Sequence, residues 1–80
     1  MRILVAEDET IIRLDLREIL ERAGYAVVAE ARDGEEAVEL AASEKPDLAI
    51  LDVKMPKLDG IDAARRILTD RPIPIVILTA

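Results

Sequence analysis

The sequence predicts an α/β fold in which a single parallel sheet is wound with helices on both faces. Four short apolar segments, at residues 3–6, 26–29, 48–51 and 75–78, are continuous rather than alternating, as in strands buried on both sides. Three longer stretches with helical periodicity separate these segments. Because strands and helices alternate along the chain, right-handed crossovers should place all four strands parallel in one sheet.

The stretch after the first strand has the apolar spacing of an amphipathic helix. This helix should end at Gly24, because glycine readily adopts the left-handed conformation that closes many helices. Its apolar residues recur at intervals that form one stripe, which we expect to face the sheet: Ile12, Leu16, Ile19, Leu20 and Ala23.

The other two helices carry boundary signals. Asp33 is a candidate N-cap of the second helix, with Glu36 three residues later as in a capping box. The second helix should stop before Pro46, because a residue that precedes proline avoids helical angles. The third helix should run from about Gly60 to Thr69. Its predicted inward residues are Ile61, Ala64, Ile67 and Leu68.

The composition and charge argue against several classes of protein, among them disulfide-rich, membrane-spanning and nucleic-acid-binding proteins. The chain has 80 residues, no cysteine and a net charge of −6, so it offers no disulfide framework or thiolate metal site. Its length fits one small domain or part of one. No apolar run approaches the roughly 18 residues that cross a bilayer, and the start of the chain does not resemble a signal peptide. We expect a cytoplasmic protein without membrane contact, and the acidic charge argues against direct nucleic-acid binding by this segment.

Acidic residues follow two of the predicted strands. Glu7, Asp8 and Glu9 follow the first strand, and Asp52 follows the third. Ligands of open parallel sheets bind outside the carboxyl ends of strands, so Asp8 and Asp52 should converge if those strands are neighbours. A cation would neutralise the pair, and oxygen ligands without histidine or cysteine favour Mg²⁺. The alternative is a solvated turn, with Glu9 simply in the first turn of a helix.

Three motifs together resemble a known family. They are ILVAED at 3–8, ILDVKMPKLDG at 50–60 and VILTA at 76–80, and they match in register over the whole chain. The combination resembles the receiver domain of bacterial two-component response regulators. The resemblance implies a flavodoxin-like doubly wound sheet of order 2-1-3-4, with the fifth strand–helix unit missing. Residues 1–80 would then be the N-terminal part of a single receiver domain, without an output domain.

The resemblance also implies a role for each site residue. Asp52 would be the phosphoacceptor for a sensor histidine kinase. The side chains of Asp8 and Asp52 and the backbone carbonyl of Lys54 would bind Mg²⁺. Glu7 would act on the metal through a water, and Thr79 would hydrogen-bond the phosphoryl group as a switch hydroxyl. Such a domain is a signalling module, enzymatic at most in its own phosphorylation and dephosphorylation. Within the family, the motifs look most like regulators with an antiterminator-type, RNA-binding output domain.

The chain departs from the family pattern after Ala80. The family continues there with a further strand, which carries a lysine that pairs with the phosphoryl group. Without that lysine the switched state should be weakened. The segment 75–78 would also be an exposed apolar edge, through which we expect self-association.

Two other functions stay open on the sequence. One is a non-catalytic receiver fragment that keeps the acidic metal site but does not switch, in which Thr79 is an ordinary β-branched residue at a strand end. The other is an Mg²⁺-dependent phosphohydrolase with an aspartyl nucleophile. Such enzymes place an aspartate two residues after the nucleophile, where this chain has Lys54.

Overall fold

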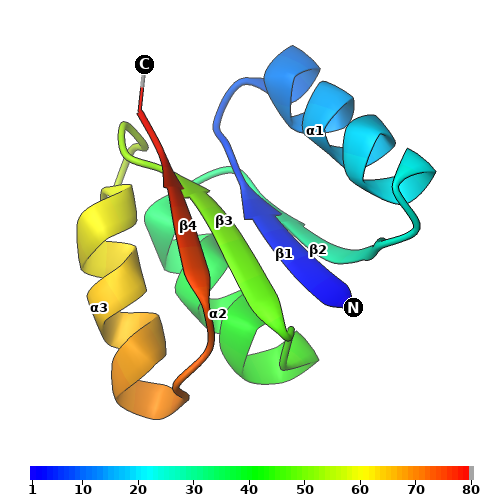
Figure 1. Cartoon of the computed structure of the whole chain (residues 1–80). Coiled ribbons are helices and arrows are strands. Elements are labelled where there is room, and N and C mark those ends of the chain that lie inside the picture. Colours follow the sequence, from blue (N-terminus) through cyan, green and yellow to red (C-terminus); the bar gives the residue numbers. More distant parts are fainter. Residues whose placement is uncertain (80) are drawn as a thin grey trace.

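The computed structural model describes residues 1–79 and shows a four-stranded parallel sheet between helices (Figure 1). The strands are β1 (Arg2–Ala6), β2 (Ala26–Ala31), β3 (Leu48–Asp52) and β4 (Ile75–Leu78). The helices are α1 (Thr10–Arg22), α2 (Gly34–Glu44) and α3 (Gly60–Asp70). The strand order is β2-β1-β3-β4 and every pairing is parallel, which confirms the predicted fold. Ala80, the last residue of the predicted domain, lies outside the described residues.

The helices lie on opposite faces of the sheet, with α2 and α3 on one side and α1 on the other (Figure 1). Leu4 and Leu51 pack into the core under α2 and α3. Ile3, Val5 and Ile50 pack toward α1 on the opposite face. Because successive strand residues point to opposite faces, a strand covered on both sides must be apolar throughout, as the sequence indicated. Within residues 1–79, no helix is long and apolar enough to cross a membrane.

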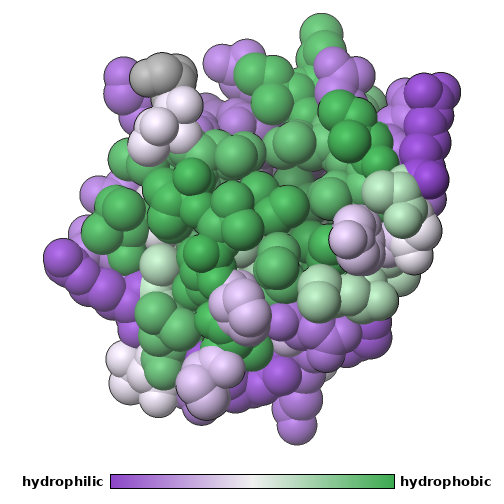
Figure 2. All heavy atoms as spheres, viewed as in Figure 1, coloured by the Kyte–Doolittle hydropathy of each residue, from purple (hydrophilic) through white to green (hydrophobic). Residues whose placement is uncertain are grey.

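The sheet face that carries α1 is apolar beyond the area covered by that helix (Figure 2). Helix α1 packs against β1 and β2. Leu48 and Leu78 are only partly buried on this face, and Val76 of β4 is 43% exposed. Within the described residues, β4 pairs with β3 on one side only. The expected self-association through this strand stays a prediction.

Helix α1 confirms only part of the stripe that the sequence predicted to face the sheet. Its buried residue is Arg13, which is 9% exposed, while Leu16 and Leu20 are half-buried. These three residues are spaced i, i+3 and i+7 and therefore share a face. The prediction was right for Leu16 and Leu20 and missed Arg13, because apolar periodicity does not count an arginine on the inward face. The members of the predicted stripe that are exposed are Ile12, Ile19 and Ala23.

Helix α3 confirms only part of its predicted inward face. Ile67 is buried and Ala64 is half-buried, as expected. Ile61 and Leu68 are 39% and 48% exposed, so they do not belong to the core. Ala63, which is fully buried, takes their place because a small side chain lets the helix lie close to the sheet.

The predicted N-cap of α2, Asp33, is confirmed. The Asp33 carboxylate accepts a hydrogen bond from the Glu36 N–H at 2.8 Å. The Glu36 carboxylate accepts from the Arg32 N–H at 2.8 Å, one residue before the amide that a capping box would use. Asp59 caps α3 in the same way by accepting from the Asp62 N–H at 2.8 Å. Each cap satisfies an amide that has no partner inside its helix.

The loop after β3 lies directly against the start of α2. A Cβ atom added at Gly34 would lie 1.9 Å from the backbone oxygen of Leu58, closer than atoms can approach. Lys57 of the same loop has a left-handed φ of 68°, and its Nζ lies 3.6 Å from the Asp33 carboxylate. The start of α2 therefore supports the loop that leads away from Asp52.

Replacing Gly34 with alanine should destabilise the fold. Alanine has the better helix propensity, but its Cβ must displace the backbone at Leu58. We expect Gly34→Ala to lower the free energy of unfolding by about 1–3 kcal/mol, as for other overpacked positions. Urea denaturation measures this change. The matched control is the exposed neighbour Glu35, whose replacement by alanine should change stability by less than about 0.5 kcal/mol. Equal stability of wild type and Gly34→Ala would contradict the close approach.

The Asp33 cap should give the fold an acid-sensitive stability. The hydrogen bond from the Glu36 N–H, helped by the nearby Lys57 ammonium, holds the pKa of Asp33 below its ordinary value of 3.8. A depressed folded-state pKa stabilises the fold above the unfolded pKa, and this stabilisation is lost as pH falls through the folded pKa. Asn can still cap but does not titrate. The difference in unfolding free energy between wild type and Asp33→Asn should therefore shrink as pH falls below 3.8. Urea denaturation across a pH series tests this, and a pH-independent difference would refute it.

Candidate functional site

Strands β1, β3 and β4 end side by side at one edge of the sheet. Ala6 pairs with Leu51 across β1 and β3, and Asp52 pairs with Leu78 across β3 and β4. The residues that follow these pairs therefore emerge together, with Thr79 directly after Leu78. Parallel strands present their carboxyl ends to the same edge, which is where open α/β sheets bind ligands.

Three carboxylates meet at this edge. Glu7, Asp8 and Asp52 each offer an oxygen atom, and these atoms lie within 4.8 Å of one another. Opposite ligands of an octahedral Mg²⁺ ion lie about 4.2 Å apart, twice its bond length to oxygen. Only a small adjustment of side chains separates the observed spacing from that geometry. The donor set, which consists of oxygens alone, fits a hard divalent cation.

Glu7 is the most unusual member of the cluster because it is 5% exposed. Burial raises the pKa of Glu7, and the neighbouring Asp8 and Asp52 push in the same direction, against the hydrogen bond from the Glu9 N–H. That N–H lies 3.1 Å from the Glu7 carboxylate. A buried carboxylate beside two others is unfavourable when charged. A bound cation would relieve this repulsion.

The carboxylates open into a cavity of about 440 Å³. Cavities of this size accommodate small ligands. All five site residues suggested by the sequence lie in its wall. The lining residues are Glu7, Asp8, Glu9, Ile12, Asp52, Val53, Lys54 and Thr79.

The loop after Asp52 returns tightly onto the end of β3. The Gly60 N–H donates to the Val53 carbonyl at 2.9 Å. A Cβ atom at Gly60 would lie 2.0 Å from the Asp52 carbonyl oxygen, so the closure needs glycine. Met55 anchors the middle of the loop, since it is 8% exposed in the main core. Asp52 is therefore held by the strand before it and by the loop after it.

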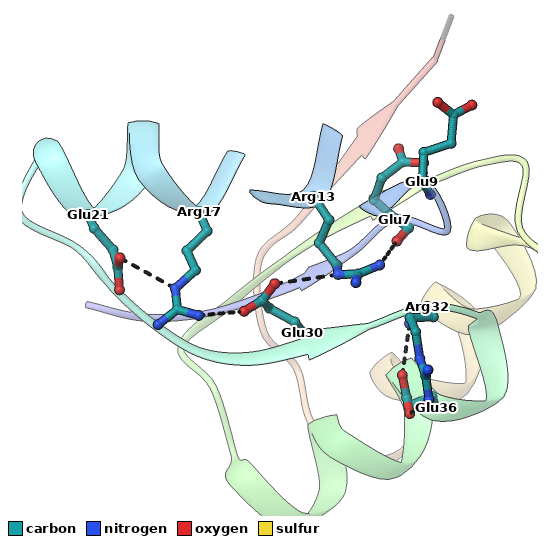
Figure 3. A network of polar contacts seen from close by, with 8 residues as sticks. All are labelled: Glu7, Glu9, Arg13, Arg17, Glu21, Glu30, Arg32 and Glu36. Carbon is teal, nitrogen blue, oxygen red and sulfur yellow. Dashed lines mark hydrogen bonds and ion pairs between the residues drawn. The ribbon is translucent and has the colours of Figure 1, made fainter. Parts of the chain in front are cut away.

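Sequence reasoning missed Arg13, which contacts this site from α1 (Figure 3). Its Nη1 donates to the Glu7 backbone carbonyl at 2.8 Å, and its Nε lies 3.4 Å from the Glu30 carboxylate. Arg17 pairs with the other oxygen of Glu30 at 2.8 Å. The signal was available as two arginines spaced i, i+4 on one helix, but apolar periodicity alone assigned the inward face.

Comparison with known proteins agrees with this geometry. Residues 3–80 match the family described as the response regulator receiver domain. The transcriptional regulatory protein PdtaR of Mycobacterium tuberculosis is 62% identical over 79 residues, which are 99% of this chain and 38% of PdtaR. Response regulator MprA of Mycolicibacterium vanbaalenii is 46% identical over 81 residues, covering 100% of this chain and 35% of MprA.

Solved structures agree as well. The crystal structure of the response regulator domain of Thermotoga maritima CheB matches with a TM-score of 0.95 and 36% identity. The match covers 99% of this chain and 60% of that one. This chain spans little more than a third of the length of PdtaR and of MprA. The family match, the sequence identity and the structural match each cover nearly the whole chain. The chain belongs to the family of response regulator receiver domains.

Proposed function

We propose that Asp52 accepts a phosphoryl group from a sensor histidine kinase, with Mg²⁺ held beside it by the acidic edge. Receiver domains are signalling modules of two-component systems and are phosphorylated by histidine kinases. The observation that carries the proposal is the meeting of Glu7, Asp8 and Asp52 within 4.8 Å at the mouth of a cavity. No other acidic cluster with this spacing occurs in residues 1–79.

The side chains that would hold the metal have distinct surroundings. Asp8 is exposed and Asp52 is half-buried, so both can present an oxygen to an ion in the cavity. The Lys54 backbone carbonyl would be the third protein ligand, and the buried Glu7 would act through a water. When bound, Mg²⁺ offsets the negative charge that gathers between the carboxylates and the phosphoryl oxygens.

Asp52 serves as the nucleophile. One of its carboxylate oxygens attacks phosphorus, the bond from phosphorus to the donor imidazole nitrogen breaks, and that electron pair stays on the imidazole. Such transfer depends on position and charge more than on covalent chemistry by the protein. The fixed end of β3 supplies the position, because Leu51 is fully buried and Gly60 closes the loop beyond.

Thr79 reads the modification. It follows β4, lines the same cavity and neighbours Asp52 through the pairing of Asp52 with Leu78. The phosphoryl group adds strong acceptor oxygens to the site, and the Thr79 hydroxyl donates a hydrogen bond to one of them. The movement of Thr79 toward the phosphoryl group then passes the signal to β4.

We propose a module that changes state and does not turn over an external substrate. It makes no direct contact with nucleic acid, in keeping with its net charge of −6. The cytoplasmic location, the antiterminator-type output and self-association through 75–78 stay predictions.

Intact-mass measurement tests the phosphoacceptor directly. The chain is incubated with acetyl phosphate and Mg²⁺, and we expect the mass to rise by one phosphoryl group. Asp52→Asn should abolish the gain because the nucleophile is lost, and a chelator should abolish it because the charge is no longer neutralised. The matched control is Asp15→Asn, an exposed acid on α1 that should leave the gain unchanged.

Two further outcomes separate the alternatives. A folded chain that binds Mg²⁺ but gains no mass would contradict the proposal and favour a non-catalytic receiver fragment.

Thr79→Val should still gain the phosphoryl group, because the nucleophile is intact. It should lose the amide chemical-shift changes along β4 that accompany phosphorylation of the wild type. A Thr79→Val chain that shows the same β4 shift changes as the wild type would contradict the switch role.

A further inference from the structure

One buried guanidinium holds the turn that carries the acidic residues. Arg13 is 9% exposed, and its Nη1 donates to the Glu7 backbone carbonyl at 2.8 Å (Figure 3). That carbonyl belongs to the peptide plane that joins Glu7 to Asp8. The hydrogen bond therefore fixes the direction in which the chain leaves Glu7, and with it the starting point of the Asp8 side chain.

The guanidinium is itself held from β2. Its Nε lies 3.4 Å from one oxygen of Glu30, whose other oxygen receives Arg17 Nη1 at 2.8 Å. The turn is also bonded to the same strand, since the Glu7 N–H donates to the Ala31 carbonyl at 3.0 Å. The position of Arg13 is thus set by β2 and α1, which do not supply the carboxylates.

Fold stability alone does not explain a charge at this position. Burying an arginine costs free energy even when it is paired, and a buried ion pair replaced as a whole by apolar residues of similar volume often leaves a fold as stable or more stable. Leu16 and Leu20 share the inward face of α1, so an apolar residue would suit it. Within residues 1–79, Arg13 Nε has no hydrogen-bond partner, and its ion pair at 3.4 Å is long.

We propose that Arg13 is a positioning residue for the Mg²⁺ site. Its side chain orients the peptide between Glu7 and Asp8 so that the acidic edge is ready to bind the ion. This inference rests on the metal site of the proposed function. Arg13 acts through its hydrogen bond to the Glu7 carbonyl and does not itself contact the ion.

The sign of the effect on Mg²⁺ affinity separates positioning from simple charge. As a positive charge near the carboxylates, Arg13 repels a divalent cation, so its removal would tighten binding. As the donor that fixes the peptide plane, its removal weakens binding because the ligands must be ordered by the ion itself. Hydrogen-bond partners behind metal ligands typically change affinity by about 10–100-fold.

Calorimetric titration of the folded chain with MgCl₂ tests the inference. We expect Arg13→Gln to bind Mg²⁺ about 10-fold more weakly than the wild type. Arg13→Lys should be intermediate, because an ammonium can donate to the Glu7 carbonyl but cannot also reach Glu30 in the same fork geometry. The matched control is Arg17→Gln, which removes an arginine from the same network without touching the Glu7 carbonyl, and its affinity should stay within twofold of the wild type.

Arg13→Met is a second variant that separates an effect on Mg²⁺ binding from loss of the fold. Methionine fills the space of the arginine stem, and Glu30 keeps its pair with Arg17. Urea denaturation without Mg²⁺ should show Arg13→Met to unfold cooperatively at reduced stability, because the buried Glu7 carbonyl loses its donor, while its Mg²⁺ affinity falls by about 10-fold. Unchanged or tighter Mg²⁺ binding in a folded Arg13→Met or Arg13→Gln would overturn the positioning role alone. A wild type that binds no Mg²⁺ would overturn the metal site and this inference together.

Discussion

The parallel pairing of β1 with β3 is the constraint on which the site depends. The two strands are far apart in the sequence, and the register of Ala6 with Leu51 brings their ends to one edge of the sheet. Because strand side chains alternate between faces, a slip of one residue would turn Asp52 away from the carboxylates of β1. The apolar residues that set this register, such as Leu4 and Leu51, are buried almost completely. The core thus determines the position of the acidic edge.

Holding acids together has a cost that the surrounding structure must meet. Glu7 is buried beside two other carboxylates, and its raised pKa reflects that burial. Two hydrogen bonds compensate: the Glu9 N–H donates to the Glu7 carboxylate, and the Arg13 guanidinium donates to the Glu7 backbone carbonyl. On the other side of the site, the contact between Gly34 and Leu58 fixes the loop beyond Asp52. These contacts position the carboxylates, which suits a reaction that depends on position.

The sequence predicted the sheet well because buried parallel strands leave continuous apolar runs, and capping residues such as Asp33 act locally. The convergence of Asp8 and Asp52 followed from strand order. The predicted inward face of α1 was right for Leu16 and Leu20 but missed Arg13, which is buried through contacts with Glu7 and Glu30 that apolar periodicity does not register. Likewise, the need for glycine at position 34 arises from a backbone oxygen far away in the sequence.

The most direct test of the central claim is where a divalent ion binds on the folded chain. Mn²⁺, which shares the preference of Mg²⁺ for carboxylate and carbonyl oxygens, broadens the NMR signals of nearby amides. Substoichiometric Mn²⁺ should first broaden the amides of Glu7, Asp8 and Asp52, and excess Mg²⁺ should restore them. Broadening spread evenly over the other acidic surfaces, such as the exposed Glu35 and Glu39 of α2, would contradict a metal site built by the pairing of β1 with β3.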